Sequence, residues 1–322
     1  MKYVRKFDNQ TDYNIYKIIT NNNALCGYVN NGNLIIEQEP VIPIPNDEIW
    51  YTSTDGNTVT PTSLDIFGDY DVVRVINNTY SNGKGILKCD GNVTIIGNHA
   101  FYEANTLQSI KIPQTVTTIA ESAFEECENL VSIDLNNTTT IEDYAFYFCT
   151  SLNSLTIPNT LTSIGQFAFY NCSGLTGNLT IPNTITSIGQ DAFSTCIGLT
   201  SLVINSNSNT IIRQNAFEDC MGLTSLTING DFVFNDSGYF LKSALETITI
   251  GSSVTNINKF YSSTKVKSIT VLNTTPPAID RIVLANLCGT ETKIYVPAGY
   301  VDTYKTDNYW KYQSSKIRAI PA

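Results

Sequence analysis

Charged side chains are scarce in this chain of 322 residues, at 15% of the total, whereas soluble domains usually carry about a quarter. Basic residues are the rarer kind, 19 against 29 acidic ones, so the formal net charge is −10. Such a surface repels a phosphate backbone, and no basic run of five or more residues offsets the repulsion. Nucleic acids are therefore excluded as partners.

Long apolar runs are also missing. None approaches the roughly 18 residues that a helix needs to cross a bilayer, which excludes insertion into a membrane. The first twenty residues contain basic side chains but no apolar stretch of the length found in a Sec signal peptide. We therefore expect no Sec-dependent export.

Histidine is almost absent, because His99 is the only one. Ser-His-Asp and Cys-His mechanisms and His-based zinc sites would all depend on this single residue. The sequence has no G-x-G-x-x-G and no P-loop. The DGN triplets at 55–57 and 90–92 are better explained as hairpin turns than as calcium loops. We predict no enzymatic activity, no cofactor and no metal.

Cysteines are plentiful by contrast, and five of the eight recur at intervals of 22, 23, 24 and 24 residues. This spacing fits neither a metal-binding C-x-x-C pair nor a compact disulfide knot, but it is typical of stacked repeats. Cys26, Cys89 and Cys288 lie outside the period and remain unassigned. The periodic residues are Cys127, Cys149, Cys172, Cys196 and Cys220.

Each period repeats the same apolar positions around a phenylalanine. Alanine precedes it, isoleucine lies five residues before it, leucine six residues after it, and cysteine three residues after it in five copies. The L-x-x-[IL]-x-[IL] run predicts a strand with one buried side, and the T-[ST]-I segment predicts a second, shorter strand. The A-F-x-x-C segment predicts a short helical turn that packs over them. The six phenylalanines are Phe101, Phe124, Phe146, Phe169, Phe193 and Phe217.

These repeats predict a solenoid, because no single repeat can bury its apolar face without its neighbours. The predicted fold is a β-rich α/β repeat solenoid, right-handed, with parallel β rungs and short helical turns. Residues 86–272 resemble the BspA-like subclass of leucine-rich repeats, since six copies agree at four or more positions. That family is common in surface proteins of gut and mouth bacteria and is also found in their phages. The resemblance implies a non-catalytic protein that binds a protein or glycan partner.

Smaller regions flank the repeats. We expect an N-terminal module and linker at 1–45 and a cap at 46–85, with the first half-repeat in GILKCDGNVTIIG. A segment of about 40 residues is too short to be stable alone, so residues 1–39 are expected to dock onto another chain, either a second copy or a virion subunit.

The last region, residues 273–322, is expected to cap the other end of the repeats. Its sequence predicts a final strand, a short helix and an aromatic plug that closes the core. The plug consists of Tyr304, Tyr309, Trp310 and Tyr312.

The periodic cysteines are interpreted as packing residues, because Ala104 and Ser243 fill the equivalent position elsewhere. Rungs on the helical side are expected to lie about 9–10 Å apart, beyond the roughly 7 Å that a disulfide spans between Cα atoms. Free, buried thiols are therefore predicted, which suits assembly in a reducing compartment.

Variable positions around the phenylalanine turn hold aromatic side chains on neighbouring rungs. Exposed aromatic residues are enriched at interfaces, so they are the candidate binding site. The outward strand positions, such as Ser109, Ser132 and Ser201, form a small and nearly uncharged face instead. The predicted binding patch consists of Tyr102, Tyr144, Tyr147, Phe148, Phe167 and Tyr170.

Two functions stay open at this point. The first is adhesion or interaction at a bacterial surface, which the abundance of the family on surfaces favours. The alternative is a bacteriophage virion component, structural or host-recognising, anchored through its N-terminal module, which the missing signal peptide favours. Localisation is left between a virion assembled in host cytoplasm and a surface protein exported by other means.

Overall fold

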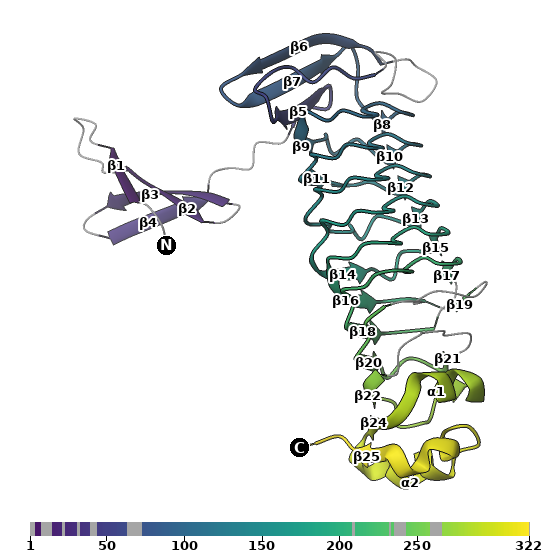
Figure 1. Cartoon of the computed structure of the whole chain (residues 1–322). Coiled ribbons are helices and arrows are strands. Elements are labelled where there is room, and N and C mark those ends of the chain that lie inside the picture. Colours follow the sequence, from purple (N-terminus) through teal and green to yellow (C-terminus); the bar gives the residue numbers. More distant parts are fainter. Residues whose placement is uncertain are drawn as a thin grey trace. The chain divides into compact units, whose positions relative to one another are not determined.

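The repeat period of the sequence becomes a stack of β rungs in the computed structural model, within a unit formed by residues 44–322 (Figure 1). Residues 1–43 form a second compact unit. The structure describes residues 4–7, 15–20, 23–30, 33–38, 44–62, 73–207, 210–231, 233–234, 243–257 and 266–321, with the backbone alone for 4–38 and 233–234.

The N-terminal unit is an antiparallel sheet of the strands β1 (Val4–Phe7), β2 (Ile15–Thr20), β3 (Asn23–Asn30) and β4 (Asn33–Gln38). The strands pair in sequence order, so β1 and β4 are its edges. The linker expected at the end of residues 1–45 lies partly outside the described residues.

An antiparallel sheet begins the second unit. It contains β5 (Glu48–Ser53), β6 (Val75–Ser81) and β7 (Lys84–Cys89). The GILKC segment expected to start the first rung belongs to β7, and β5 lies between it and the first rung strand, β9 (Leu107–Lys111). Only the second part of the predicted half-repeat, β8 (Ile95–Ile96), joins the parallel ladder.

A column of two-residue strands forms one side of the stack and confirms the short strand predicted from T-[ST]-I. Each of these strands ends in a buried isoleucine, except the last one, which ends at Phe234. After β8 the column contains β10 (Thr118–Ile119), β12 (Thr140–Ile141), β13 (Ser163–Ile164), β15 (Ser187–Ile188), β17 (Ile211–Ile212) and β19 (Val233–Phe234).

The longer strands form the other side, in two sheets separated by a break. Residues 152–158, predicted as a rung strand, are not a strand, so β11 (Ser132–Asp134) and β14 (Gly177–Ile181) have no partner between them. The break falls where the repeat lengthens from 23 to 24 residues. The extra residue, Gly177, has a left-handed φ of 78°, and the register of β14 against the following strand shifts next to it. Beyond β14 the strands are β16 (Leu199–Ile204), β18 (Ser225–Ile228), β20 (Thr247–Ile250), β22 (Val266–Val271), β24 (Cys288–Val296) and β25 (Ile317–Ala319), and β21 (Asn256–Ile257) pairs with β23 (Ala278–Ile279) beside them.

The A-F-x-x-C segments are paired turns, so the prediction of helical turns was wrong. In every copy, the residues two before and two after the phenylalanine have a left-handed φ of 53–59°. Every second backbone N–H group of the turn then donates along the stack to the next rung. Phe146 N, for example, donates to Ala168 O of the next rung at 2.8 Å. A helix would use these donors internally, whereas the turns bond from rung to rung.

The six phenylalanines form one buried stack. Neighbouring rings lie nearly parallel with centroids 5.0–5.4 Å apart, and each side chain is fully buried. The expected separation of 9–10 Å is therefore wrong on this side. Packed helices keep their axes roughly 8–10 Å apart, but turns that bond like strands stack near the usual strand spacing of about 4.8 Å.

The periodic thiols are free and buried, as predicted, although the distance argument for that prediction fails. Each cysteine donates its thiol hydrogen to the carbonyl oxygen of the phenylalanine one rung earlier, at 2.9–3.2 Å. Burial raises the pKa of Cys127 and Cys220 to about 12. Cys89 is also free and buried, Cys288 is buried, and the side chain of Cys26 is outside the described set.

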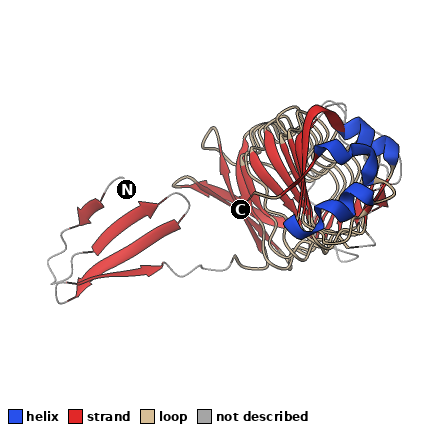
Figure 2. Ribbon diagram, turned by 90° about the horizontal axis from the view of Figure 1, so that it is seen from below, coloured by secondary structure: helices blue, strands red, loops and turns tan. Residues whose placement is uncertain are grey.

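Two short helices cover the C-terminal end of the stack, α1 (Arg281–Leu287) and α2 (Val301–Thr306), together with two 3₁₀ turns (Figure 2). Tyr304 and Trp310 are fully buried, and their ring centroids are 5.5 Å apart. The hydroxyl of Tyr304 donates to the backbone oxygen of residue 273, and the indole N–H of Trp310 donates to that of residue 277. Tyr309 and Tyr312 are about half exposed, so they do not close the core as predicted. Tyr312 instead lies under the guanidinium of Arg281.

Candidate functional site

Five of the six predicted patch residues meet on two adjacent rungs, following β12 and β13 (Figure 1). Each ring is partly exposed. Across the rungs, Tyr144 stacks on Phe167 at 5.1 Å and Tyr147 stacks on Tyr170 at 5.3 Å. Phe148 completes the group, with its ring centroid 4.6 Å from that of Tyr147. We call these five residues the aromatic cluster.

Tyr102 stands apart from the aromatic cluster. The intervening rung carries Ser122 and Glu125 at the positions that hold aromatic residues in the next two rungs. The ring of Tyr102 instead lies 5.7 Å from the exposed His99. A hydrogen bond with Glu103 is the main reason that the pKa of Tyr102 is raised to about 12.

Three members of the aromatic cluster occupy left-handed backbone positions. Tyr144, Phe148 and Phe167 have φ values of 58°, 58° and 54°. Bulky side chains are disfavoured there, while asparagine and aspartate are tolerated. The same turn positions in other rungs hold mostly small or polar residues, among them Asp191 and Asn215. Folding therefore does not require aromatic residues at these positions.

A polar groove of about 570 Å³ adjoins the aromatic cluster. Its carboxylates come from the residues just before the cluster, since Asp143 precedes Tyr144 in the chain. Asp143 Oδ1 accepts a hydrogen bond from Gln166 N at 2.8 Å, and Glu142 Oε2 accepts one from Glu121 N at 3.1 Å. These bonds hold both carboxylates at the groove by using backbone donors of adjacent rungs.

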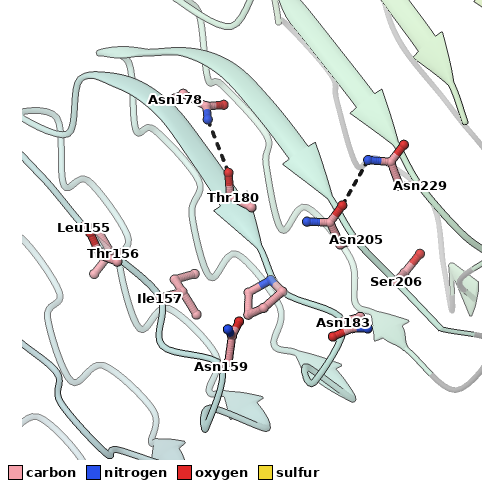
Figure 3. A pocket seen from close by; sticks show the side chains of 11 residues that line it. Leu155, Thr156, Ile157, Asn159, Asn178, Thr180, Asn183, Asn205, Ser206 and Asn229 are labelled. Atoms are coloured by element: carbon pink, nitrogen blue, oxygen red, sulfur yellow. Dashed lines mark hydrogen bonds between the residues drawn. The ribbon is translucent and has the colours of Figure 1, made fainter.

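A second groove, of about 650 Å³, opens on the longer-strand side at the break between β11 and β14 (Figure 3). Sequence reasoning missed it, although an asparagine follows the end of the rung in four consecutive repeats. Its lining carries no charge. Asn229 Nδ2 donates to Asn205 Oδ1 at 3.0 Å, and Asn178 Nδ2 donates to Thr180 Oγ1 at 3.2 Å.

Among the described side chains of this unit, no group of three or more His, Cys, Asp or Glu residues is placed to hold a metal ion. His99 is exposed on the surface, and burial keeps the periodic thiols protonated by raising the pKa of each. Within the part of the chain that the structure describes, no helix has the length and apolar character to span a membrane.

Comparison with known families agrees with this geometry. The model of the BspA type leucine rich repeat region, with six copies, matches residues 85–196 and 175–287, which together cover more than half of the chain. The chain belongs to the BspA-type leucine-rich-repeat family. It is therefore a leucine-rich-repeat scaffold, a class that is generally non-enzymatic. No curated protein matches the sequence.

Solved structures of bacterial leucine-rich-repeat proteins are similar to parts of this chain. A Treponema pallidum leucine-rich-repeat protein is 28% identical over 48% of this chain and 72% of its own, with a TM-score of 0.42. A leucine-rich-repeat protein from Bacteroides ovatus is 23% identical over 90% of this chain and 71% of its own, with a TM-score of 0.40.

Proposed function

We propose that this BspA-type solenoid is a non-catalytic binding scaffold that contacts a protein or glycan partner at a bacterial surface through its aromatic cluster. The observation that carries the proposal is the placement of three bulky aromatic residues at left-handed backbone positions. Residues held in disfavoured conformations by the surrounding structure concentrate at functional sites.

The partial exposure of the aromatic cluster supports the same proposal. Its five rings form a continuous surface, because every member lies within 6 Å of another ring centroid. Tyrosine and phenylalanine contribute large contact areas to interfaces at a small cost in side-chain entropy. The buried Phe146 and Phe169 lie in the same turns but are committed to the core.

Replacing Tyr144 and Phe167 together by asparagine tests this function. Asparagine tolerates the left-handed backbone, so the double variant is expected to fold while losing the exposed rings. We would measure labelled full-length protein on a glycan array and, by flow cytometry, on intact bacterial cells with and without prior protease treatment. Loss of binding by the double variant is the expected result, and protease sensitivity would identify a protein partner.

The matched control is Tyr312→Asn, which removes a half-exposed tyrosine from the C-terminal cap. It should bind like the original protein. If the Tyr144→Asn/Phe167→Asn variant also binds as strongly as the original, the aromatic cluster is not the contact surface.

A second candidate function is a virion component, structural or host-recognising, anchored through residues 1–39. The separate N-terminal unit supports it, because its four strands form an open sheet with β1 and β4 at the edges. An edge strand offers backbone donors and acceptors that can pair with another chain. A truncated chain tests this anchoring directly, as described in the Discussion.

A further inference from the structure

Basic residues are nearly absent from the repeats that carry the aromatic cluster. Residues 90–212 contain ten Asp and Glu residues but only one Lys or Arg, Lys111. The whole chain has 29 acidic and 19 basic residues, so its charge imbalance of ten is nearly all located here. The repeats that carry the rings therefore have a net negative charge, which the repeat pattern does not require.

These carboxylates approach the aromatic cluster from two sides. On the preceding rung, Glu125 occupies the turn position that Tyr147 holds in the next one, and Glu126 N donates to Tyr147 O at 2.7 Å. On the other side, Glu142 and Asp143 line the adjoining groove of about 570 Å³. A ligand over the rings would meet carboxylates at both edges.

The chain supplies little positive charge to balance these carboxylates. The ion pairs of the described residues join Lys88 to Asp47 and Glu48, and Lys267 to Glu246, all away from the aromatic cluster. Within the groove lining, Arg213 is the basic residue, and it lies three repeats after Asp143 in the sequence. Uncompensated charge beside exposed rings favours a cationic partner.

We propose that the aromatic cluster docks an arginine- or lysine-rich segment of a partner polypeptide. A guanidinium or ammonium group lies over the electron-rich faces of Tyr147 and Phe167, where a cation is attracted to the ring. The flanking carboxylates accept charge-assisted hydrogen bonds from the same head groups. This proposal rests on the proposed function, because it names the chemistry of the partner that contacts the aromatic cluster.

A fluorescein-labelled peptide of five arginine-glycine repeats is the probe, measured with the full chain by fluorescence anisotropy. The same peptide with citrulline in place of arginine keeps the shape of the side chain and removes its charge. Two variants test the two parts of the surface: Tyr147→Leu keeps an apolar side chain without the ring, and Glu125→Gln with Glu142→Gln removes charge alone. Tyr312→Leu and Glu291→Gln, both at exposed positions of the C-terminal cap, are the matched controls.

We expect the arginine peptide to bind at least tenfold more tightly than the citrulline peptide. Tyr147→Leu and the double glutamine variant should each weaken binding by about threefold to tenfold, and the controls should not. The far-ultraviolet circular dichroism and melting of each variant are measured first, to confirm that it folds.

Three results would overturn the inference. If both peptides bind equally, charge is not recognised. If the acidic substitutions weaken binding but Tyr147→Leu does not, the peptide binds by general electrostatic attraction rather than on the rings. If neither peptide binds, the partner has another chemistry. In each case the glycan-array and cell-binding results for the Tyr144→Asn/Phe167→Asn variant still decide the proposed function separately.

Discussion

Replacing Phe169 by alanine should be among the most damaging single substitutions in the solenoid. The ring is fully buried and stacks between Phe146 at 5.1 Å and Phe193 at 5.0 Å, nearly parallel to both. Truncating a buried phenylalanine costs about 3–5 kcal/mol through lost burial and the cavity left behind. The upper part of this range is expected because two ring contacts are lost, each worth about 0.5–1.5 kcal/mol.

The cavity left by Phe169→Ala cannot collapse easily. Backbone hydrogen bonds join Phe146 N to Ala168 O and Phe169 N to Ala192 O, at 2.8 and 2.7 Å, and keep the neighbouring turns at their spacing. The adjacent Tyr170 is the matched comparison, since its ring is partly exposed. Tyr170→Ala should therefore cost only about 1 kcal/mol, which is typical of point substitutions in general.

The assay is equilibrium unfolding in urea, followed by circular dichroism for the repeats and by tryptophan fluorescence for the two ends. Trp50 lies in the N-terminal cap and Trp310 in the C-terminal cap, so separate transitions of the two ends would be seen. A free energy of unfolding that falls more for Tyr170→Ala than for Phe169→Ala would refute the assignment of buried and exposed faces.

Four further predictions concern the core, the turns and the N-terminal unit. Cys172→Ala should lower the free energy of unfolding by only about 1–2 kcal/mol, because the cavity that it leaves is small. Thiol titration of the protein, unfolded without a reducing agent, should find the five periodic thiols free. The unfolded chain loses thiol protons above about pH 9, whereas burial raises the folded pKa of Cys127 and Cys220 to about 12. The free energy of unfolding should therefore be retained below pH 9 and fall as the pH rises toward 12, by about 1.4 kcal/mol per pH unit and thiol. Urea unfolding at pH 7, 9 and 10 checks this, and it would be contradicted if the free energy of unfolding of Cys127→Ala fell with pH as steeply as that of the original protein. Phe167→Asn should change stability by no more than about 1 kcal/mol, because relief of the left-handed backbone offsets the lost ring contacts, and a loss comparable to that of Phe169→Ala would show that Phe167 is part of the core. A chain starting at Asp47 should be monomeric in light scattering while the full chain associates; if both are monomeric and residues 1–39 resist proteolysis, the N-terminal unit is not an attachment module.

The features that recur in every repeat could be predicted from the sequence, because each recurrence marks a side chain with the same environment in each rung. The buried column of Phe124, Phe146 and Phe169, the short T-[ST]-I strands and the free thiols are of this kind. Aromatic residues that vary between rungs, such as Tyr147 and Tyr170, could likewise be assigned to the surface of the turns.

The remaining features depend on contacts between rungs, which a local pattern does not contain. The A-F-x-x-C spacing fits a helical turn as well as a paired turn, and the choice is made by N–H groups such as that of Phe146, which bond to the next rung. That choice also sets the spacing near 5 Å. It brings five aromatic residues together and leaves Tyr102 apart across the rung of Glu125. The groove beside the sheet break likewise depends on how neighbouring rungs are placed. Periodicity therefore determined the core and the exposed face of each turn, whereas the tertiary hydrogen bonds decided the conformation of the turns and the shape of the surface they carry.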